Sequence, residues 1–385
     1  MTLPKFLCFL IICCASEVCA QQIIGGHVTD AETGKPIAFS TVTAAASLQT
    51  LSNETGEFEL SLSNLPITLQ VSHLGYQTRT LTIEKQSSAV NIQLIPKTFE
   101  LPEAKVGNPA LAIIQEAAKK AMENYKKTFP GKAFLRQTAY QAGKPAYLQE
   151  IWFDASWTAY GLLKWNPTES RRLAAGKGIN YTNFSFSTLI FSGYLPNNLL
   201  LKPLRKSADS LYTFKLTGTT EKDGQEIARI NCIPRTGVKD VRFEGDYYIN
   251  TVTNDIVMID GIIRDMKFTS SGPMSIKNKE TRFSAQFHLN DQGDNVLEYA
   301  TFNLINRLKV MGFGTQDTEL YNTLFLTTLP NTFPAAALED VRPDINDQSL
   351  IRSMHTDPEF WQKNPGIIRT AKEQEAIKEL EKIPR

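Results

Sequence analysis

The chain has 385 residues, 41 of them Lys or Arg and 40 Asp or Glu, so its formal net charge is only +1. No long basic or acidic block is present, and charge therefore gives no reason to expect nucleic acid or an anionic membrane surface as a partner. This length predicts two or three domains and allows a substantial hydrophobic core.

Residues 1–20 predict a secretory signal peptide. Lys5 precedes an apolar segment, "FLCFLIICC" (residues 6–14), that is too short to cross a bilayer as a helix. The small residues of "VCA" predict cleavage before Gln21. A lipoprotein signal that uses Cys19 or Cys13 is the alternative, although the residues before either cysteine fit a lipobox poorly. We expect export to the periplasm or to the outer membrane and cell surface.

Export also limits the role of cysteine. Of the five cysteines in the chain, only Cys232 follows the predicted cleavage site, so an internal disulfide in the mature protein is excluded. Cys232 lies in the strand-like run "EIARINCIPR", where a buried, unreactive thiol is the expected role.

Residues 22–96 alternate between apolar and polar positions over short runs separated by polar turns. Ile67, Leu69 and Val71 show this spacing, and the turn at residues 53–56 is followed at once by Phe58. Short strands at regular intervals, rich in β-branched residues, predict an all-β sandwich.

Three phrases in this region, "GHVTDAETGKPIAFSTVT", "SNETGEFEL" and "HLGYQTRTLTI", resemble the carboxypeptidase-regulatory-like domain. The matching positions are Gly26, Val28, Asp30, Thr33, Gly34, Pro36, Ile37, Val42, Gly56, Phe58, Gly75 and Tyr76. The resemblance implies a seven-stranded prealbumin-like sandwich of the kind found in Bacteroidetes envelope proteins, and it implies no peptidase activity. The first phrase also has a physical reading, because Asp30 and Thr33 can close a turn through their side chains.

Residues 97–108 contain prolines and predict a linker. A helix is expected from residue 109, with Asn108 as its N-cap and Pro109 in its first turn. Its apolar face would consist of Ile113, Ile114, Ala117, Ala121 and Tyr125.

Residues 109–345 predict this helix plus a curved antiparallel sheet, either a half-barrel or a barrel, because long strand-like runs flank turns at residues 222–225, 253–254 and 291–294. The phrase around residues 245–261 resembles the central hairpin of lipoprotein-carrier-like half-barrels. Residues 346–385 predict a helical tail with a capping box between Thr370 and Glu373. The tail resembles the ends of Bacteroidetes proteins that begin with the same sandwich, and that resemblance implies no established activity.

The sequence offers little catalytic chemistry. Its four histidines do not form a zinc-peptidase motif, and the chain contains no nucleophile elbow, Walker loop or dinucleotide-binding motif. Neither a metal nor a cofactor is expected. Carboxylates gather in the hairpin at residues 240–265, where an acid/base pair of a hydrolase is one hypothesis and a solvated strand face the simpler one.

Aromatic residues gather in "YLQEIWFDASWTAYGLLKW", and arginines follow. The candidate ligand-binding residues are Trp152, Trp157, Tyr160, Trp165, Arg171 and Arg172. They could form a stacking platform for sugar rings or an apolar ligand beside an anion site; packing into a β core is the simpler alternative.

The sequence therefore predicts a mainly β, exported and non-enzymatic envelope protein that acts as an interaction or ligand-binding module. Its expected partner is an envelope protein, glycan or lipid, with peripheral association at the outer membrane. Carbohydrate binding through the Trp152–Trp165 region and an envelope hydrolase are the two alternatives. The oligomeric state is not predicted.

Overall fold

The computed structural model describes residues 22–45, 48–62, 64–85, 89–97, 99–100, 108–124, 127–158, 161–176, 203–204, 207–222, 224–239, 241–266, 274–290, 292–310, 314–328, 338–342, 347–364 and 366–383. The predicted signal peptide lies outside these residues. Within them, no helix is long and apolar enough to cross a membrane.

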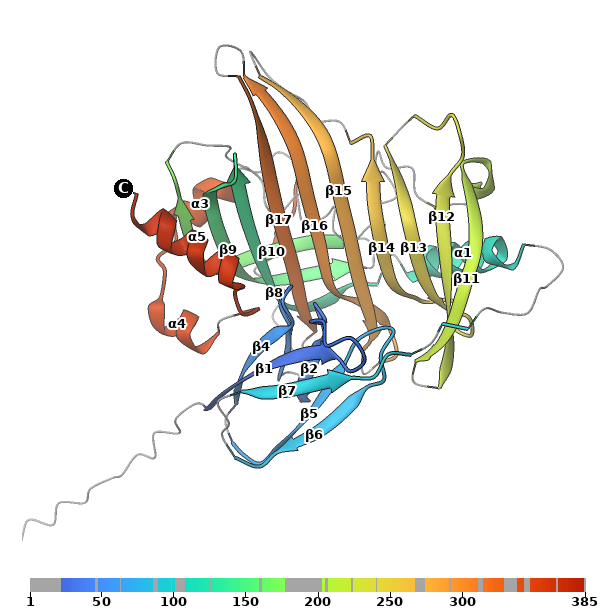
Figure 1. Ribbon diagram of the computed structural model, residues 1–385, viewed down its shortest axis with the longest axis horizontal. Helices are drawn as coiled ribbons and strands as arrows, with labels where there is room; N and C mark the ends of the chain where they lie inside the picture. The colour runs from blue at the N-terminus through green and yellow to red at the C-terminus, as the bar shows by residue number, and fades with distance from the viewer. Residues whose placement is uncertain are drawn as a thin grey trace, which may run out of the picture.

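The N-terminal domain is a sandwich of two small sheets, as predicted (Figure 1). One sheet has the order β4-β1-β7 and contains β1 (Gln22–Asp30), β4 (Glu57–Leu62) and β7 (Val90–Leu94). The other has the order β3-β2-β5-β6 and contains β2 (Thr41–Ala45), β3 (Leu48–Leu51), β5 (Ile67–Ser72) and β6 (Arg79–Ile83). Alternate apolar side chains of both sheets, among them Ile24, Val28 and Leu69, fill the space between them.

The opening motif forms the predicted turn. Oδ1 of Asp30 accepts hydrogen bonds from the backbone N–H groups of Glu32 at 2.8 Å and Thr33 at 2.7 Å. Gly34 follows with φ of +68°, a conformation that favours glycine. The hydroxyl of Tyr76 donates to Oδ2 of Asp30 at 2.9 Å. This hydrogen bond joins the first motif phrase, which contains Asp30, to the third, which contains Tyr76.

An open sheet of 11 strands forms the main body, with every neighbouring pair antiparallel. Its order is β11-β12-β13-β14-β15-β16-β17-β8-β9-β10-β18. The strands are β8 (Phe129–Gln141), β9 (Lys144–Thr158), β10 (Gly161–Ala174), β11 (Tyr212–Lys222), β12 (Gln225–Pro234), β13 (Arg242–Asn250), β14 (Ile256–Arg264), β15 (Met274–Leu289), β16 (Asn295–Val310), β17 (Gly314–Thr328) and β18 (Glu339–Asp340). A short 3-10 helix, η1 (Ala208–Ser210), precedes β11. The predicted curved, half-barrel-like sheet is confirmed.

Helix α1 (Pro109–Asn124) packs against one face of this sheet, near β11 and β13 (Figure 1). Ala110, Ile114 and Ala117 are buried there in a cluster that extends across most of the strands. Asn108 caps the helix as predicted, since its Oδ1 accepts from the backbone N–H of Leu111 at 3.3 Å. Cys232 is buried in the same cluster, and burial raises its pKa strongly, as expected for an unreactive thiol.

The described part of the tail contains three helices, α3 (Asp347–Ser353), α4 (Pro358–Lys363) and α5 (Ala371–Glu381). They cover β9 and β10 at the end of the sheet opposite β11 (Figure 1). Asp357 caps α4, and the predicted capping box of Thr370 and Glu373 begins α5. The tail therefore docks on its own chain.

The sandwich contacts the sheet near the linker and again at Phe39. Near the linker, Glu100 and Thr219 of β11 exchange backbone hydrogen bonds of 2.9 Å, and the ring of Phe99 contacts Tyr248. At the other end, Phe39 of the sandwich stacks on Tyr299 of the sheet with ring centroids 5.3 Å apart. Residues 99 and 100 of the predicted linker are thus packed against the sheet.

Candidate functional site

Glu150 on β9 is the centre of the contact between tail and sheet. Its side chain is fully buried and is bound by three arginines. Arg136 donates from Nε at 2.7 Å, Arg171 donates from Nε, and Arg369 of the tail donates from Nε at 3.1 Å and from Nη2 at 2.5 Å. Burial opposes the charged form, but the arginines outweigh it and lower the pKa of Glu150 to about 2.

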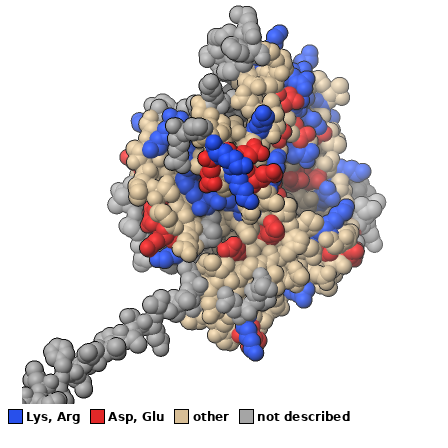
Figure 2. Space-filling model, turned by 60° about the vertical axis from the view of Figure 1, so that its left-hand side comes forward, with Lys and Arg blue, Asp and Glu red and all other residues tan. Residues whose placement is uncertain are grey.

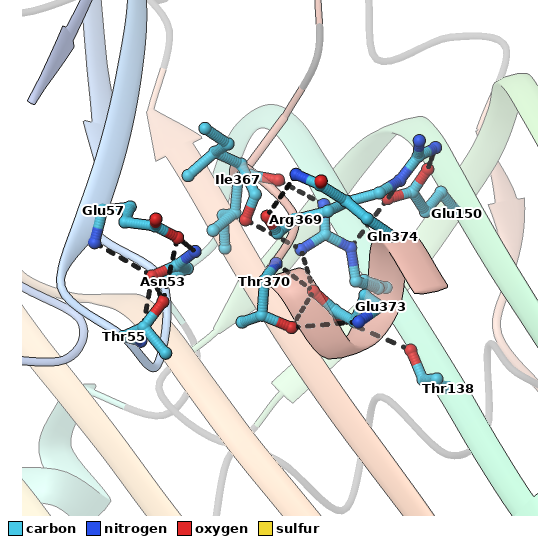
Figure 3. Close-up of polar contacts among 12 residues, drawn as sticks. Asn53, Thr55, Glu57, Thr138, Glu150, Ile367, Arg369, Thr370, Glu373 and Gln374 are labelled. Carbon is cyan, nitrogen blue, oxygen red and sulfur yellow. Dashed lines mark hydrogen bonds and ion pairs between the residues drawn. The ribbon is translucent and has the colours of Figure 1, made fainter. Parts of the chain in front are cut away.

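Arg136 continues this network into the tail. Its other donors reach the backbone oxygens of Ile367 and, at 3.3 Å, Ile368. It also contacts the carboxylate of Glu373 at 3.3 Å. Figure 3 shows the capping box of Thr370 and Glu373 beside Glu150 and Arg369, close to the sandwich turn that carries Asn53, Thr55 and Glu57. Sandwich, sheet and tail thus meet in one region.

Aromatic packing reinforces the same junction. The guanidinium of Arg171 lies 4.0 Å from the ring centroid of Trp361. Trp361 belongs to a buried cluster drawn from all three parts, with Leu51 from the sandwich and Phe134 from the sheet. Gly366 has φ of +72°, and a Cβ placed there would lie 2.5 Å from Cε2 of Phe134. Only glycine at position 366 lets the tail approach the ring of Phe134 this closely.

A cleft of about 270 Å³ opens beside the junction. It is lined by Leu48, Gln49, Thr50, Glu59, Leu60 and Ser61 of the sandwich, by Lys132, Trp152, Phe153, Thr168 and Thr327 of the sheet, and by Phe360, Lys363, Asn364 and Gly366 of the tail. Each of the three parts supplies a wall. Figure 2 shows this side of the molecule, where charges of both signs are mixed over the sheet and tail and the sandwich below is mostly neutral.

Trp152 is held firmly in the cleft wall. Its indole N–H donates to the backbone oxygen of Asn364 at 3.2 Å, and its ring packs against Phe134 with centroids 5.3 Å apart. The half-buried ring therefore has a fixed orientation. The two lysines of the cleft carry paired charges, since Lys132 contacts Asp154 at 2.9 Å and Lys363 contacts Glu359 at 3.8 Å.

The structure does not bring the predicted aromatic residues together on one surface. Trp157 and Trp165 are 0% and 2% exposed and belong to the core. The reason is strand alternation: Trp157 shares a face of β9 with Phe153 and Ala155, whereas Trp152 points to the opposite face. The expectation of a shared stacking platform is thereby corrected, and Trp152 alone lines the cleft. Tyr160 lies outside the described residues.

The two arginines also have separate roles. Arg171 is bound to Glu150 and stacked on Trp361, whereas the guanidinium of Arg172 lies 5.8 Å from the ring centroid of Tyr147. Side chains of adjacent residues on a strand point to opposite faces, so the two cannot hold one anion together.

The sequence gives no signal for the other residues that line the cleft. Phe360, Asn364 and Gly366 reach the cleft from positions 208 to 214 residues further along the chain than Trp152, and the sandwich residues from about 100 residues before it. Alternation along β9 places Glu150 and Trp152 on the same face of the strand. This alternation is the sequence signal that points to the position of the cleft.

The carboxylates of the hairpin at residues 240–265 are mostly engaged in ion pairs. Asp246 accepts from Arg229 at 3.0 and 2.6 Å and from Asn231 at 2.8 Å, and Glu244 accepts from Arg264 at 2.9 Å. Asp260 faces Asp246 across the two strands, and burial together with the charge of Asp246 raises its pKa. Asp265 pairs with Arg242, and Asp240 lies outside the described residues. The described residues contain no cluster of three or more His, Cys, Asp or Glu that could hold a metal.

The chain matches two protein families. Residues 24–106 match the CarboxypepD_reg-like domain, as the resemblance predicted. Residues 113–316, more than half of the chain, match the family of unknown function DUF5686. Among curated proteins, no sequence matches.

Several solved structures are similar to part of the chain. A DUF1329 family protein from Desulfovibrio piger has 10% identity and a TM-score of 0.23, with 57% of this chain and 94% of that chain covered. A protein of unknown function from Bacteroides fragilis has 14% identity and a TM-score of 0.16, with coverage of 80% and 97%. A LolA superfamily protein from Nitrosomonas europaea has 10% identity and a TM-score of 0.20, with coverage of 57% and 94%. By its family match, the chain belongs to the family of unknown function DUF5686, with a CarboxypepD_reg-like domain at its front.

Proposed function

We propose that this protein is an exported, non-enzymatic module of the cell envelope that binds the end of a saccharide in the cleft between sandwich, sheet and tail. The observation that carries the proposal is the fixed indole of Trp152 in a cleft whose walls come from all three parts. A site assembled in this way is closed by tertiary packing and needs no rearrangement to accept a ligand.

The composition of the cleft fits a sugar. A sugar ring has apolar C–H faces that pack on aromatic rings, and Trp152 and Phe360 supply such rings. Its hydroxyls need hydrogen-bonding partners, and the amides of Gln49 and Asn364 and the hydroxyl of Thr168 lie around the same space. The volume of about 270 Å³ is slightly below the range of about 300–1,000 Å³ typical of ligand pockets, which favours a small terminal group.

The charges of the cleft support binding over catalysis. Glycoside hydrolysis generally requires a pair of carboxyl groups that flank the scissile bond. Among the described residues that line the cleft, Glu59 is the only carboxylate. The Asp246–Asp260 pair lies on β13 and β14, and neither residue lines the cleft. The proposal therefore assigns no catalytic residue.

The test is a calorimetric titration of the mature chain, residues 21–385, with a panel of saccharides that carry different terminal residues. We expect at least one to bind, and Trp152→Ala to abolish that binding while the circular dichroism spectrum is kept. Ile233→Ala is the matched control, because Ile233 is 47% exposed on β12 and does not line the cleft. Saccharide affinity that is unchanged in Trp152→Ala would remove the cleft from consideration, and turnover of the saccharide would refute the non-enzymatic assignment.

A further inference from the structure

Two tyrosines at the other end of the tail enclose the side chain of Lys372. Tyr140 on β8 and Tyr321 on β17 meet edge to face, with ring centroids 6.1 Å apart. The Nζ atom of Lys372 lies 4.2 Å from the centroid of Tyr140 and 5.0 Å from that of Tyr321. Glu319 forms a third wall, with its carboxylate 3.8 Å from Nζ and 2.7 Å from the hydroxyl of Tyr321. Aromatic faces plus a carboxylate make a cage for a cation.

Further carboxylates surround this cage from separate parts of the fold. Burial raises the pKa of Tyr140, and the negative charges of Glu373, Glu319, Glu54 and Glu379 raise it further. Glu54 comes from the sandwich turn before β4, Glu319 from β17, and the other two from α5. Their common influence on one hydroxyl places them around the same point, which is therefore strongly attractive to a positive charge.

One buried polar group of the site lacks a direct partner within the described part of the chain. Tyr140 is only 6% exposed, and its hydroxyl oxygen is buried without a hydrogen bond there. Buried polar groups in native proteins normally have partners, so this hydroxyl indicates a site built to receive one.

The interactions that keep Lys372 in the cage are weak. Its side chain is 60% exposed, and its distance of 3.8 Å from Glu319 is too long for a hydrogen bond. Exposed ion pairs of this kind contribute little, because solvent screens the charges and the flexible side chain loses entropy. A ligand that brings its own positive charge can therefore take the position of Nζ.

We propose that the cage formed by Tyr140, Tyr321 and Glu319 is a second binding site that accepts a small organic cation of the alkylammonium type, and that Lys372 occupies it in the free protein. This site is separate from the saccharide cleft. Lys132 in the cleft and Tyr140 in the cage are both on β8, eight residues apart, which corresponds to about 26 Å along a strand.

The test is an NMR titration of the mature chain, carrying labelled tyrosine, with tetramethylammonium chloride. We expect saturable shifts of the ring signals of Tyr140 and Tyr321, and none with sodium chloride at equal ionic strength or with the neutral isostere tert-butanol. Lys372→Ala empties the cage and should bind roughly three- to tenfold tighter, the range of one cation–aromatic contact. Glu319→Gln should bind more weakly than the natural chain.

Lys378→Ala is the matched control, because Lys378 is an exposed lysine on the same helix that makes no contact with the cage tyrosines. It should bind tetramethylammonium as the natural chain does. The proposal is overturned if the tyrosine shifts do not saturate in either the natural chain or Lys372→Ala, if tert-butanol produces the same shifts, or if Lys372→Ala binds no tighter than Lys378→Ala. None of these results depends on saccharide binding in the cleft.

Discussion

Arg369 and Glu150 are 219 positions apart in the sequence and form a bidentate ion pair. Nε of Arg369 lies 3.1 Å from Oε1 of Glu150, and Nη2 lies 2.5 Å from Oε2. Glu150 is fully buried, so this contact fixes the C-terminal tail to β9, near the end of the sheet opposite β11. The same tail supplies Phe360 and Asn364 to the cleft and Lys372 to the cage. Both proposed sites therefore depend on the docking of the tail.

The first prediction concerns the charge of Glu150. In Glu150→Gln, three arginines would face one another without the carboxylate that now holds them, and a buried charge that loses its partner typically costs about 3–5 kcal/mol. We expect the free energy of unfolding, measured in urea, to fall by that amount. Glu280→Gln is the control, since its pair with Arg282 is at the surface and should contribute no more than about 0.5 kcal/mol. Equal effects of the two changes would contradict the central role of Glu150.

The second prediction concerns pH. The pKa of Glu150 is about 2 in the folded protein, where burial is outweighed by Arg136, Arg369 and Arg171, against an ordinary value of 4.5. A carboxyl with a lowered pKa stabilises the fold at pH above its ordinary value, and the contribution is lost as pH falls towards 2. We expect the difference in unfolding free energy between the natural chain and Glu150→Gln to be constant above about pH 5 and to shrink below it. A difference that stays constant down to pH 3 would show that the ion pairs do not set the pKa of Glu150.

A third prediction concerns Gly366. In Gly366→Ala, the new Cβ would lie 2.5 Å from the ring of Phe134, and the residue would also keep a φ of +72°. The combined clash and backbone strain should lower the free energy of unfolding by about 2–4 kcal/mol and release the tail to protease. Gly143→Ala is the control: Gly143 has φ of +75° with nothing within 4 Å, so it carries the backbone strain alone. If Gly366→Ala were no worse than this control, close packing of the tail against Phe134 would be excluded.

A fourth prediction concerns Glu54, whose pKa is raised by burial and then by the charge of Glu373. A carboxyl with a raised pKa is costly to the fold while it is ionised, but Glu54 is exposed and solvent screens its charge, so Glu54→Gln should stabilise the protein at pH 7 by no more than about 0.3 kcal/mol. The gain should vanish below about pH 4, where the carboxyl is protonated in both states. Thermal unfolding of the two chains at both pH values would show this, and a loss of stability at pH 7 would mean that Glu54 has a stabilising partner.

Local patterns predicted the elements of this fold well. The turn at Asp30, the cap at Asn108 and the capping box of Thr370 and Glu373 each depend on residues within a few positions of one another, and all three are confirmed. The hairpins of the main sheet were predicted for the same reason, because apolar alternation and a Gly or Asn turn are local signals.

The candidate sites depend on long-range contacts that the sequence does not display. The cluster of tryptophans predicts the correct strand, but one position of alternation separates the cleft residue Trp152 from the core residue Ile151. Which face of β9 is covered by the tail depends on Arg369 and Trp361, and neither has a sequence signal linked to Glu150. Close packing between parts of the chain, and not composition, decides which aromatic ring remains accessible.

The most direct test of the saccharide cleft is hydrogen exchange, followed by mass spectrometry, on the mature chain with and without a saccharide that it binds. We expect added protection in all three walls at once: β3 and β4 of the sandwich, the middle of β9, and the tail around residues 358–366. Protection confined to one wall, or located on the face of the sheet that α1 covers, would contradict a binding site at the junction.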